Sequence, residues 1–111
     1  MKDLLNKKCK PCRGGVDLFS HSQANEYLAE VPGWEIIEDD KKIKKEFKFK
    51  NFDEAIDFVD KVARVSEEEG HHPDIHIFYN KVVIELWTHA IGGLSENDFI
   101  LAAKINTATQ I

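Results

Sequence analysis

The chain has 111 residues, of which 42% are hydrophobic and 32% charged, and its formal net charge is −5. This length suits one globular domain with its own core, and the acidic balance argues against nucleic acid as the main partner. No apolar run approaches the ~20 residues that cross a membrane, and no secretory signal follows the first lysines. We therefore expect a cytoplasmic protein that binds neither nucleic acid nor membranes directly.

Residues 1–19 form a basic leader without a sustained apolar period. Residues 1–13 hold five basic side chains against Asp3, a charge of +4, so the remainder of the chain carries −9. Pro11 and the glycines that follow it predict irregular structure. We interpret the leader as a solvated tail rather than as a site for an anionic partner, and we expect the folded domain over residues 20–111.

The two cysteines, Cys9 and Cys12, form a single Cys-x-x-Cys pair in this leader. Zinc takes four ligands, and the nearest histidine is His21. The strand–helix pattern of a thioredoxin-like redox site does not follow the pair. A local disulfide, a metal shared between chains and two free thiols all stay open, and we expect no essential function for the pair.

Ser20 and Gln23 have the spacing of a capping box, and a Pro-Gly pair at 32–33 ends the helix that they begin. Strands are predicted at 34–37 and 43–49, joined by a charged turn. The second strand alternates apolar and charged residues, although Lys45 interrupts its apolar set. The two strands therefore predict an antiparallel hairpin with one polar face.

The clearest amphipathic helix spans residues 52–69, and Asn51 or Asp53 can cap its start. Gly70 is placed to be its left-handed C-terminal residue, and Pro73 prevents the helix from resuming. The predicted buried face consists of apolar residues at helical spacing: Phe52, Ala55, Ile56, Val59, Val62 and Ala63.

Two more strands are predicted at 75–79 and 82–89, and Ser95 begins a last helix with Asp98 in the capping-box position. The order is helix-strand-strand-helix-strand-strand-helix. Because the strands come as hairpins, this order predicts an α+β fold, a four-stranded antiparallel sheet with helices packed on one face. The other face carries polar residues and is either open or used for assembly.

Three histidines are expected to converge. His71 and His72 lie on the turn after the long helix, and the antiparallel hairpin returns His89 to the start of the preceding strand. Three imidazoles can bind zinc or perform acid–base chemistry near neutral pH, although a His-His-Pro by itself is also typical of a polar turn. Glu67, one helical turn before His71, is placed to orient that ring. The other histidines are expected at the surface: His21 and His76.

This pattern resembles the pterin-4a-carbinolamine dehydratase family over about residues 20–111. The residues that carry the resemblance are Glu67, His71-His72-Pro73, Tyr79-Asn80-Lys81-Val82, Thr88-His89, Gly92-Gly93-Leu94 and Asp98, with Gly33-Trp34 and Phe47-Lys48-Phe49 further back. The resemblance implies the fold just predicted. It also implies a lyase that removes water from 4a-hydroxytetrahydrobiopterin, or a related 4a-hydroxytetrahydropterin, to give quinonoid dihydropterin. This step belongs to tetrahydropterin recycling and needs no metal or organic cofactor.

The resemblance implies His71, His72 and His89 as the catalytic set, with His71 and His89 as the acid–base pair and His72 chiefly holding the pterin. The implied substrate-binding set is Glu67, Gly70, His71, His72, Trp87, Thr88, His89 and Asp98. For Asp98 the family motif suggests a place in the site, whereas the Ser95 capping box gives it a structural role, which we favour. Departures from some relatives at Gly70, Ile75 and Ala90-Ile91 bear on substrate preference.

The resemblance further implies a homodimer or homotetramer whose sheets extend across subunits, and an aromatic amino-acid hydroxylase as a candidate partner. One alternative is a protein-binding or dimerisation module with weak or no catalysis, because animal relatives also serve as dimerisation partners of a transcription factor. Another is a metal protein that uses the histidines or the cysteine pair.

Overall fold

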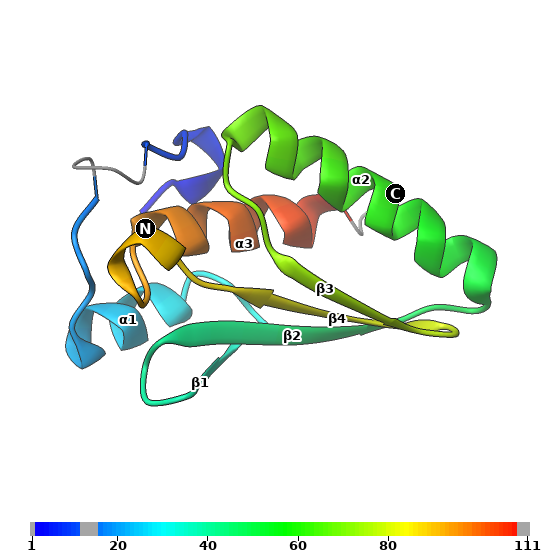
Figure 1. The fold of residues 1–111 in the computed structure, drawn as a ribbon, viewed down its shortest axis with the longest axis horizontal. Coiled ribbons are helices and arrows are strands. Elements are labelled where there is room, and N and C mark those ends of the chain that lie inside the picture. Colours follow the sequence, from blue (N-terminus) through cyan, green and yellow to red (C-terminus); the bar gives the residue numbers. More distant parts are fainter. Residues whose placement is uncertain (1, 12–15, 109–111) are drawn as a thin grey trace.

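The computed structural model describes residues 2–11 and 16–108, and it places two long helices across one face of a sheet (Figure 1). The helices are α1 (His21–Leu28), α2 (Phe52–Glu69) and α3 (Glu96–Ala108), with 3-10 turns η1 (Leu4–Asn6) and η2 (His89–Ile91). The strands are β1 (Glu35–Ile37), β2 (Lys42–Lys48), β3 (Asp74–Phe78) and β4 (Lys81–Leu86). This order confirms the predicted α+β fold.

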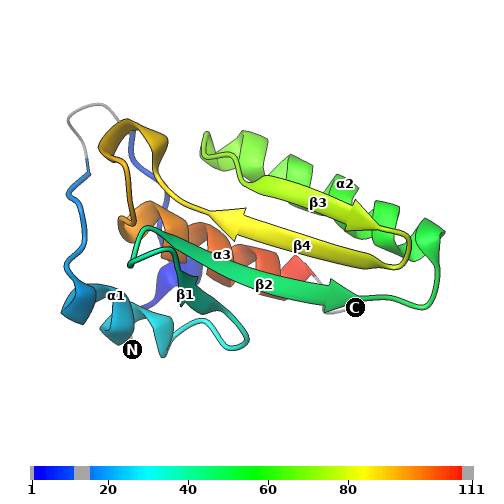
Figure 2. The ribbon, with the colours of Figure 1, turned by 60° about the horizontal axis from the view of Figure 1, so that its bottom comes forward.

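The four strands form one antiparallel sheet in the order β1-β2-β4-β3 (Figure 2). Both predicted hairpins are present, and β2 and β4 pair at the centre of the sheet, with Ile43 opposite Leu86. In the second hairpin Asp74 lies opposite Glu85. The end of β4 therefore lies beside the start of β3, close to His71 and His72.

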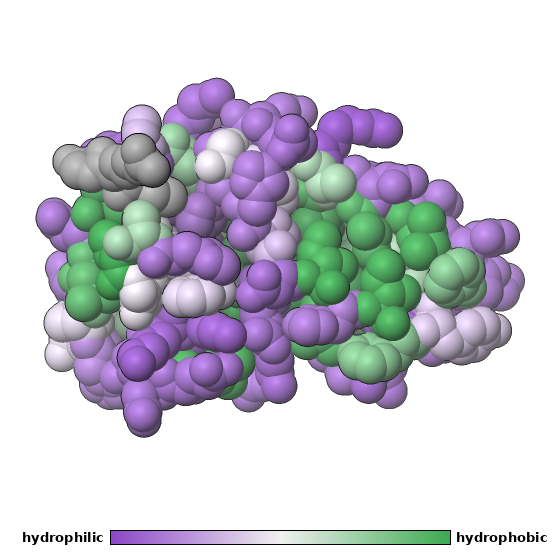
Figure 3. Space-filling view, viewed as in Figure 1, coloured by the Kyte–Doolittle hydropathy of each residue, from purple (hydrophilic) through white to green (hydrophobic). Residues whose placement is uncertain are grey.

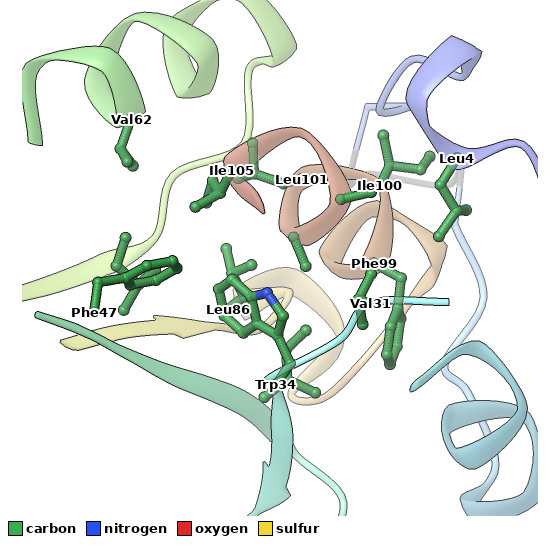
Figure 4. Packing of buried hydrophobic residues seen from close by; sticks show 14 of the residues in the cluster. Leu4, Val31, Trp34, Phe47, Val62, Leu86, Phe99, Ile100, Leu101 and Ile105 are labelled. Atoms are coloured by element: carbon green, nitrogen blue, oxygen red, sulfur yellow. The ribbon is translucent and has the colours of Figure 1, made fainter. Parts of the chain in front are cut away.

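The helix-covered face of the sheet carries the core. Val82, Ile84 and Leu86 of β4 are all fully buried and alternate with partly buried residues. Figure 4 shows Leu86 and Trp34 beneath α3, with Phe99 extending from that helix beside them. Helix α3 is buried on nearly every side from residue 97 to 103, because α2, the sheet and the leader all pack around it.

Helix α2 begins and ends as predicted, with the Asn51 side chain accepting from an N–H of the first turn and Gly70 at φ 66°. The predicted apolar face is wrong in part. The residues that the helix buries are Ala55, Phe58, Val62 and Ser66. Phe58 packs on Phe47 at a ring-centroid distance of 4.6 Å, whereas Phe52 is 48% exposed and Ala63 is exposed. The sheet selects the stripe around Phe58, since Phe47 of β2 and Phe49 just after it both pack on that ring.

The prediction that the last strand reaches His89 is also wrong. Strand β4 ends at Leu86, and His89 is the first residue of η2. The Thr88 N–H donates to the Gly93 carbonyl at 2.8 Å. This bridge folds residues 88–93 back on themselves and ends the strand.

The leader is not a solvated tail where the structure describes it, and that prediction is wrong for residues 2–11. Leu4 is only 4% exposed and joins the core beside α3 (Figure 4), because burying a leucine side chain is favourable by about 2 kcal/mol. The Lys7 ammonium lies 2.8 Å from the Glu96 carboxylate. The basic leader thus meets the acidic body of its own chain.

Cys9 is a half-buried free cysteine, whereas Cys12 lies outside the described residues. Burial, with the nearby Glu69 carboxylate, raises the pKa of the Cys9 thiol to about 12. A thiol with so high a pKa is a poor nucleophile and a poor metal ligand near neutral pH. None of the helices in the described part of the chain is long and apolar enough to span a bilayer.

Candidate active site

The first two histidines follow directly from the way that α2 ends. Gly70 adopts the left-handed conformation that a glycine takes without strain, and its N–H bonds to the last turn of the helix. The His71 N–H then donates to the Ser66 carbonyl at 3.2 Å. This closed turn directs the His71 side chain back beneath the helix end, towards α3.

His71 is buried, with 5% of its surface exposed, and its Nε2 lies 2.6 Å from Oδ1 of Asp98 on the first turn of α3. Asp98 is completely buried, and its other oxygen accepts from the Thr88 hydroxyl at 2.9 Å and the Ser95 N–H at 3.0 Å. A carboxylate only accepts hydrogen bonds, so Nε2 of His71 carries the proton. Asp98 fixes both the tautomer and the orientation of this ring.

Asp98 combines a contact within its own helix turn with the contact to His71. Its bond to the Ser95 N–H is half of a capping box. The Ser95 hydroxyl bonds to the Thr88 hydroxyl at 2.8 Å. The structural role that we favoured for Asp98 is therefore not its only one, since the same carboxylate also binds His71.

Glu67 orients a different histidine from the one expected. Its carboxylate bonds to Nε2 of His72, the exposed neighbour of His71. The i, i+4 spacing predicted His71, but the left-handed Gly70 turn sends that ring inward and leaves His72 over the side of α2. The result is a second carboxylate–imidazole pair, which lies at the surface whereas the first is buried.

His89 is held by an aromatic contact rather than by a carboxylate. Its ring lies against the Trp87 ring, with centroids 3.9 Å apart and planes at 30°. The Trp87 indole N–H in turn donates to Asp74 at the start of β3, at 3.2 Å. Asp74 escaped the sequence analysis, and its only signal is its register opposite the end of β4.

One hollow of about 390 Å³ brings the three histidines together. It is lined by Gly70, His71, His72, His89 and Ala90. Of the remaining predicted residues, Glu67, Trp87, Thr88 and Asp98 contact lining residues or their neighbours and do not line the hollow themselves. Ala90 was noted from the sequence only as a departure from the family.

The other two histidines lie away from this hollow. His21 is exposed and pairs with Asp40 at 2.8 Å, and His76 is 3.8 Å from Glu85 on the polar face of the sheet. Among the described residues, no group of three or more His, Cys, Asp or Glu side chains is arranged to hold a metal ion. His71, His72 and His89 thus form a cluster of imidazoles, each of which contacts a different side chain.

Comparison with known proteins gives a consistent result. The family described as pterin 4 alpha carbinolamine dehydratase matches residues 17–108. A protein of Nitrosospira multiformis, provisionally named pterin-4-alpha-carbinolamine dehydratase, is 50% identical over 98% of this chain and 95% of its own. Pterin-4-alpha-carbinolamine dehydratase 2, mitochondrial, of Arabidopsis thaliana is 46% identical over 96% of this chain and 59% of its own.

Two solved structures have the same fold. A transcriptional coactivator/pterin dehydratase from Brucella melitensis matches with a TM-score of 0.79 at 34% identity, over 83% of this chain and 98% of that one. A pterin dehydratase-like protein identified as a RuBisCO assembly factor of the alpha-carboxysome matches with a TM-score of 0.61 at 26% identity, over 70% and 90% of the two chains. The chain belongs to the pterin-4-alpha-carbinolamine dehydratase family.

Proposed function

We propose that the three-histidine hollow binds a 4a-hydroxytetrahydropterin and that the protein removes water from it. The observation that carries this proposal is the convergence of His71, His72 and His89 on one hollow. Two of these rings, His71 and His72, are hydrogen-bonded to carboxylates. Family membership supports the same reaction.

The reaction suits a pair of imidazoles. A protonated group donates its proton to the C4a hydroxyl, which leaves as water as the C4a–O bond breaks. The lone pair of a ring nitrogen forms the new double bond to C4a, and a base takes the proton from a ring N–H. The two proton transfers balance, so the product is quinonoid dihydropterin and water. General acid–base help of this kind contributes about 10²–10⁴-fold.

His71 and His89 are the proposed acid–base pair, and His72 holds the pterin. The buried Asp98 bond makes His71 the most tightly oriented of the three rings, and the Trp87 contact fixes His89. Glu67 positions His72 rather than His71. The main chain at Gly70 and around Trp87 and Thr88 is the proposed hydrogen-bonding edge for the pterin amide.

The test is stopped-flow absorbance of 4a-hydroxytetrahydropterin dehydration by the native chain and its histidine variants. We expect His89→Ala and His72→Ala each to reduce the rate at least tenfold, which is about 1.4 kcal/mol of barrier. His76→Ala and His21→Ala are matched controls and should stay within twofold of the native rate. A native rate equal to the uncatalysed one, or equal losses in all four variants, would refute the proposal.

An oligomer joined along β3 is the assembly that we propose. Strand β3 is an edge of the sheet, and such an edge offers unpaired backbone groups to another strand. Figure 3 shows an apolar area on the side where α2 faces β3. Exposed apolar residues at this end of the molecule are Phe52, Ile77, Phe78 and Tyr79. We propose the same surface as the binding site for an aromatic amino-acid hydroxylase.

A binding module is the second candidate, favoured by the coactivator and assembly-factor descriptions of the two solved structures. The exposed apolar edge of β3 gives it a surface. The same histidine variants separate the two functions. Partner binding that survives His72→Ala, in a chain without dehydration activity, would support the module and count against the enzyme.

A further inference from the structure

The leader, whose first 16 residues lie outside the family match at 17–108, reaches the two segments that carry the buried His71–Asp98 pair. Figure 1 shows the blue leader beside the C-terminal end of α2 and the start of α3. Two consecutive leader residues make the decisive contacts, Cys9 with α2 and Lys10 with α3. Both contacts use leader main-chain atoms.

The contact with α2 is made at Glu69, two residues before His71. The Cys9 N–H donates to Oε1 of Glu69 at 2.8 Å, and Oε2 of the same carboxylate accepts from the Lys104 ammonium at 2.6 Å. Only 6% of the Glu69 side chain is exposed. The end of α2 is therefore tied to the leader and to α3 by one buried carboxylate.

The contact with α3 is made at Asn97, the residue immediately before Asp98. The Lys10 N–H donates to Oδ1 of Asn97 at 2.9 Å, and Nδ2 of Asn97 donates to the Lys10 carbonyl at 2.8 Å. Asn97 is 1% exposed. A buried amide needs such partners, and both of these are supplied by one leader residue.

These contacts close a ring of linked residues. It runs from Glu69 to His71, across the 2.6 Å bond to Asp98, back to Asn97, and through Lys10 and Cys9 to Glu69. We propose that the leader is a positioning element of the active site, and that its main chain at Cys9 and Lys10 holds the His71 and Asp98 segments together. The kinetic consequence rests on the proposed dehydratase function, whereas the structural one does not.

The proposal gives Cys9 and Lys10 a role that does not depend on thiol chemistry. The leader contributes only backbone N–H and C=O groups to the ring, so a side-chain change at Lys10 that keeps them should be tolerated. A change that removes the Lys10 N–H should not be. Proline is the residue that deletes this donor, and it also restricts the residue before it to extended conformations.

The test compares Lys10→Pro with Lys10→Ala in the full chain. The first readout is the exchange rate of the His71 Nε2 proton with water, measured by NMR on histidine labelled with ¹⁵N. We expect Lys10→Pro to speed this exchange at least tenfold, and Lys10→Ala to leave it within twofold of native. Asn97→Ala should act like Lys10→Pro, and the exposed Lys10 site keeps the test available if the buried Asn97 variant does not fold.

Backbone amides of β2 and β4 report whether the fold as a whole has loosened. Equal acceleration of these amides and of the His71 proton would mean a merely structural leader and would overturn the proposal, as would an unchanged His71 proton in Lys10→Pro. The second readout is kinetic. Lys10→Pro should reduce kcat at least threefold with KM within twofold, because His72 and His89 remain in the hollow. An inactive native chain refutes the dehydratase function alone, since the proton-exchange result is obtained without substrate.

Discussion

Replacing Asp98 by asparagine removes one charge and almost no volume from the buried centre of the site. The native carboxylate accepts from His71 Nε2 on one oxygen and from the Thr88 hydroxyl and Ser95 N–H on the other. An amide has one accepting side and one donating side, so with its oxygen towards Thr88 and Ser95 it presents an N–H to Nε2 of His71, which must then lose its proton and accept. The opposite rotamer would set the amide N–H against the Ser95 N–H.

The magnitude follows from the lost contacts. A hydrogen bond to a charged group is worth about 1.5–3 kcal/mol, so we expect Asp98→Asn to lower the free energy of unfolding by about 2–3 kcal/mol. In a domain of this size that is a fall in melting temperature of about 10 °C. If His71 is the acid or base, the changed tautomer of its ring should also lower kcat by about 10²-fold.

Urea unfolding followed by tryptophan fluorescence measures the first effect, and stopped-flow absorbance measures the second. Asp60→Asn is the matched control, because it makes the same chemical change on the exposed side of α2. A variant that keeps native stability to within 0.5 kcal/mol, a difference small against the ~1.5–3 kcal/mol of a charged hydrogen bond, would refute the account of Asp98. An unfolding change without a kinetic one would refute only the catalytic role of His71.

Three further predictions concern groups outside the hollow. Burial opposes the charge of Glu69, but Lys104 and the Cys9 N–H outweigh burial and hold the pKa of Glu69 below its ordinary value of 4.5. The charged Glu69 therefore stabilises the fold fully above pH 4.5, and this contribution is lost as the pH falls through the lowered pKa. Urea unfolding at decreasing pH should show this loss of stability in the native chain and not in Glu69→Gln. The pKa of about 12 keeps the Cys9 thiol protonated near neutrality. In the Cys12→Ser variant, iodoacetamide at pH 8 should therefore alkylate Cys9 at least tenfold more slowly in the folded protein than in the protein unfolded in urea. Equal rates would contradict the burial of Cys9. Finally, light scattering should show an oligomer for the native chain and a smaller species for Phe78→Lys, which charges the β3 edge; a monomeric native chain would exclude assembly through this edge.

Local sequence signals were sufficient wherever neighbouring residues decide the structure. The Ser20–Gln23 capping box, the Asn51 cap and the left-handed Gly70 are all where the sequence placed them, because each depends on hydrogen bonds within one helical turn. The approach of His89 to His71 and His72 was also predictable, since an antiparallel hairpin returns the chain to its starting end.

The partners of these histidines were decided only by the packing of distant segments. His71 meets Asp98, 27 residues away, because α3 lies beneath the end of α2, and Glu67 is left to pair with His72. The leader gave no periodic signal, yet Leu4 enters the core and Lys10 binds Asn97. Composition and spacing report what a residue can do within a few positions of itself. Which buried donor meets which acceptor depends on how the helices settle on the sheet, and that is a property of the whole fold.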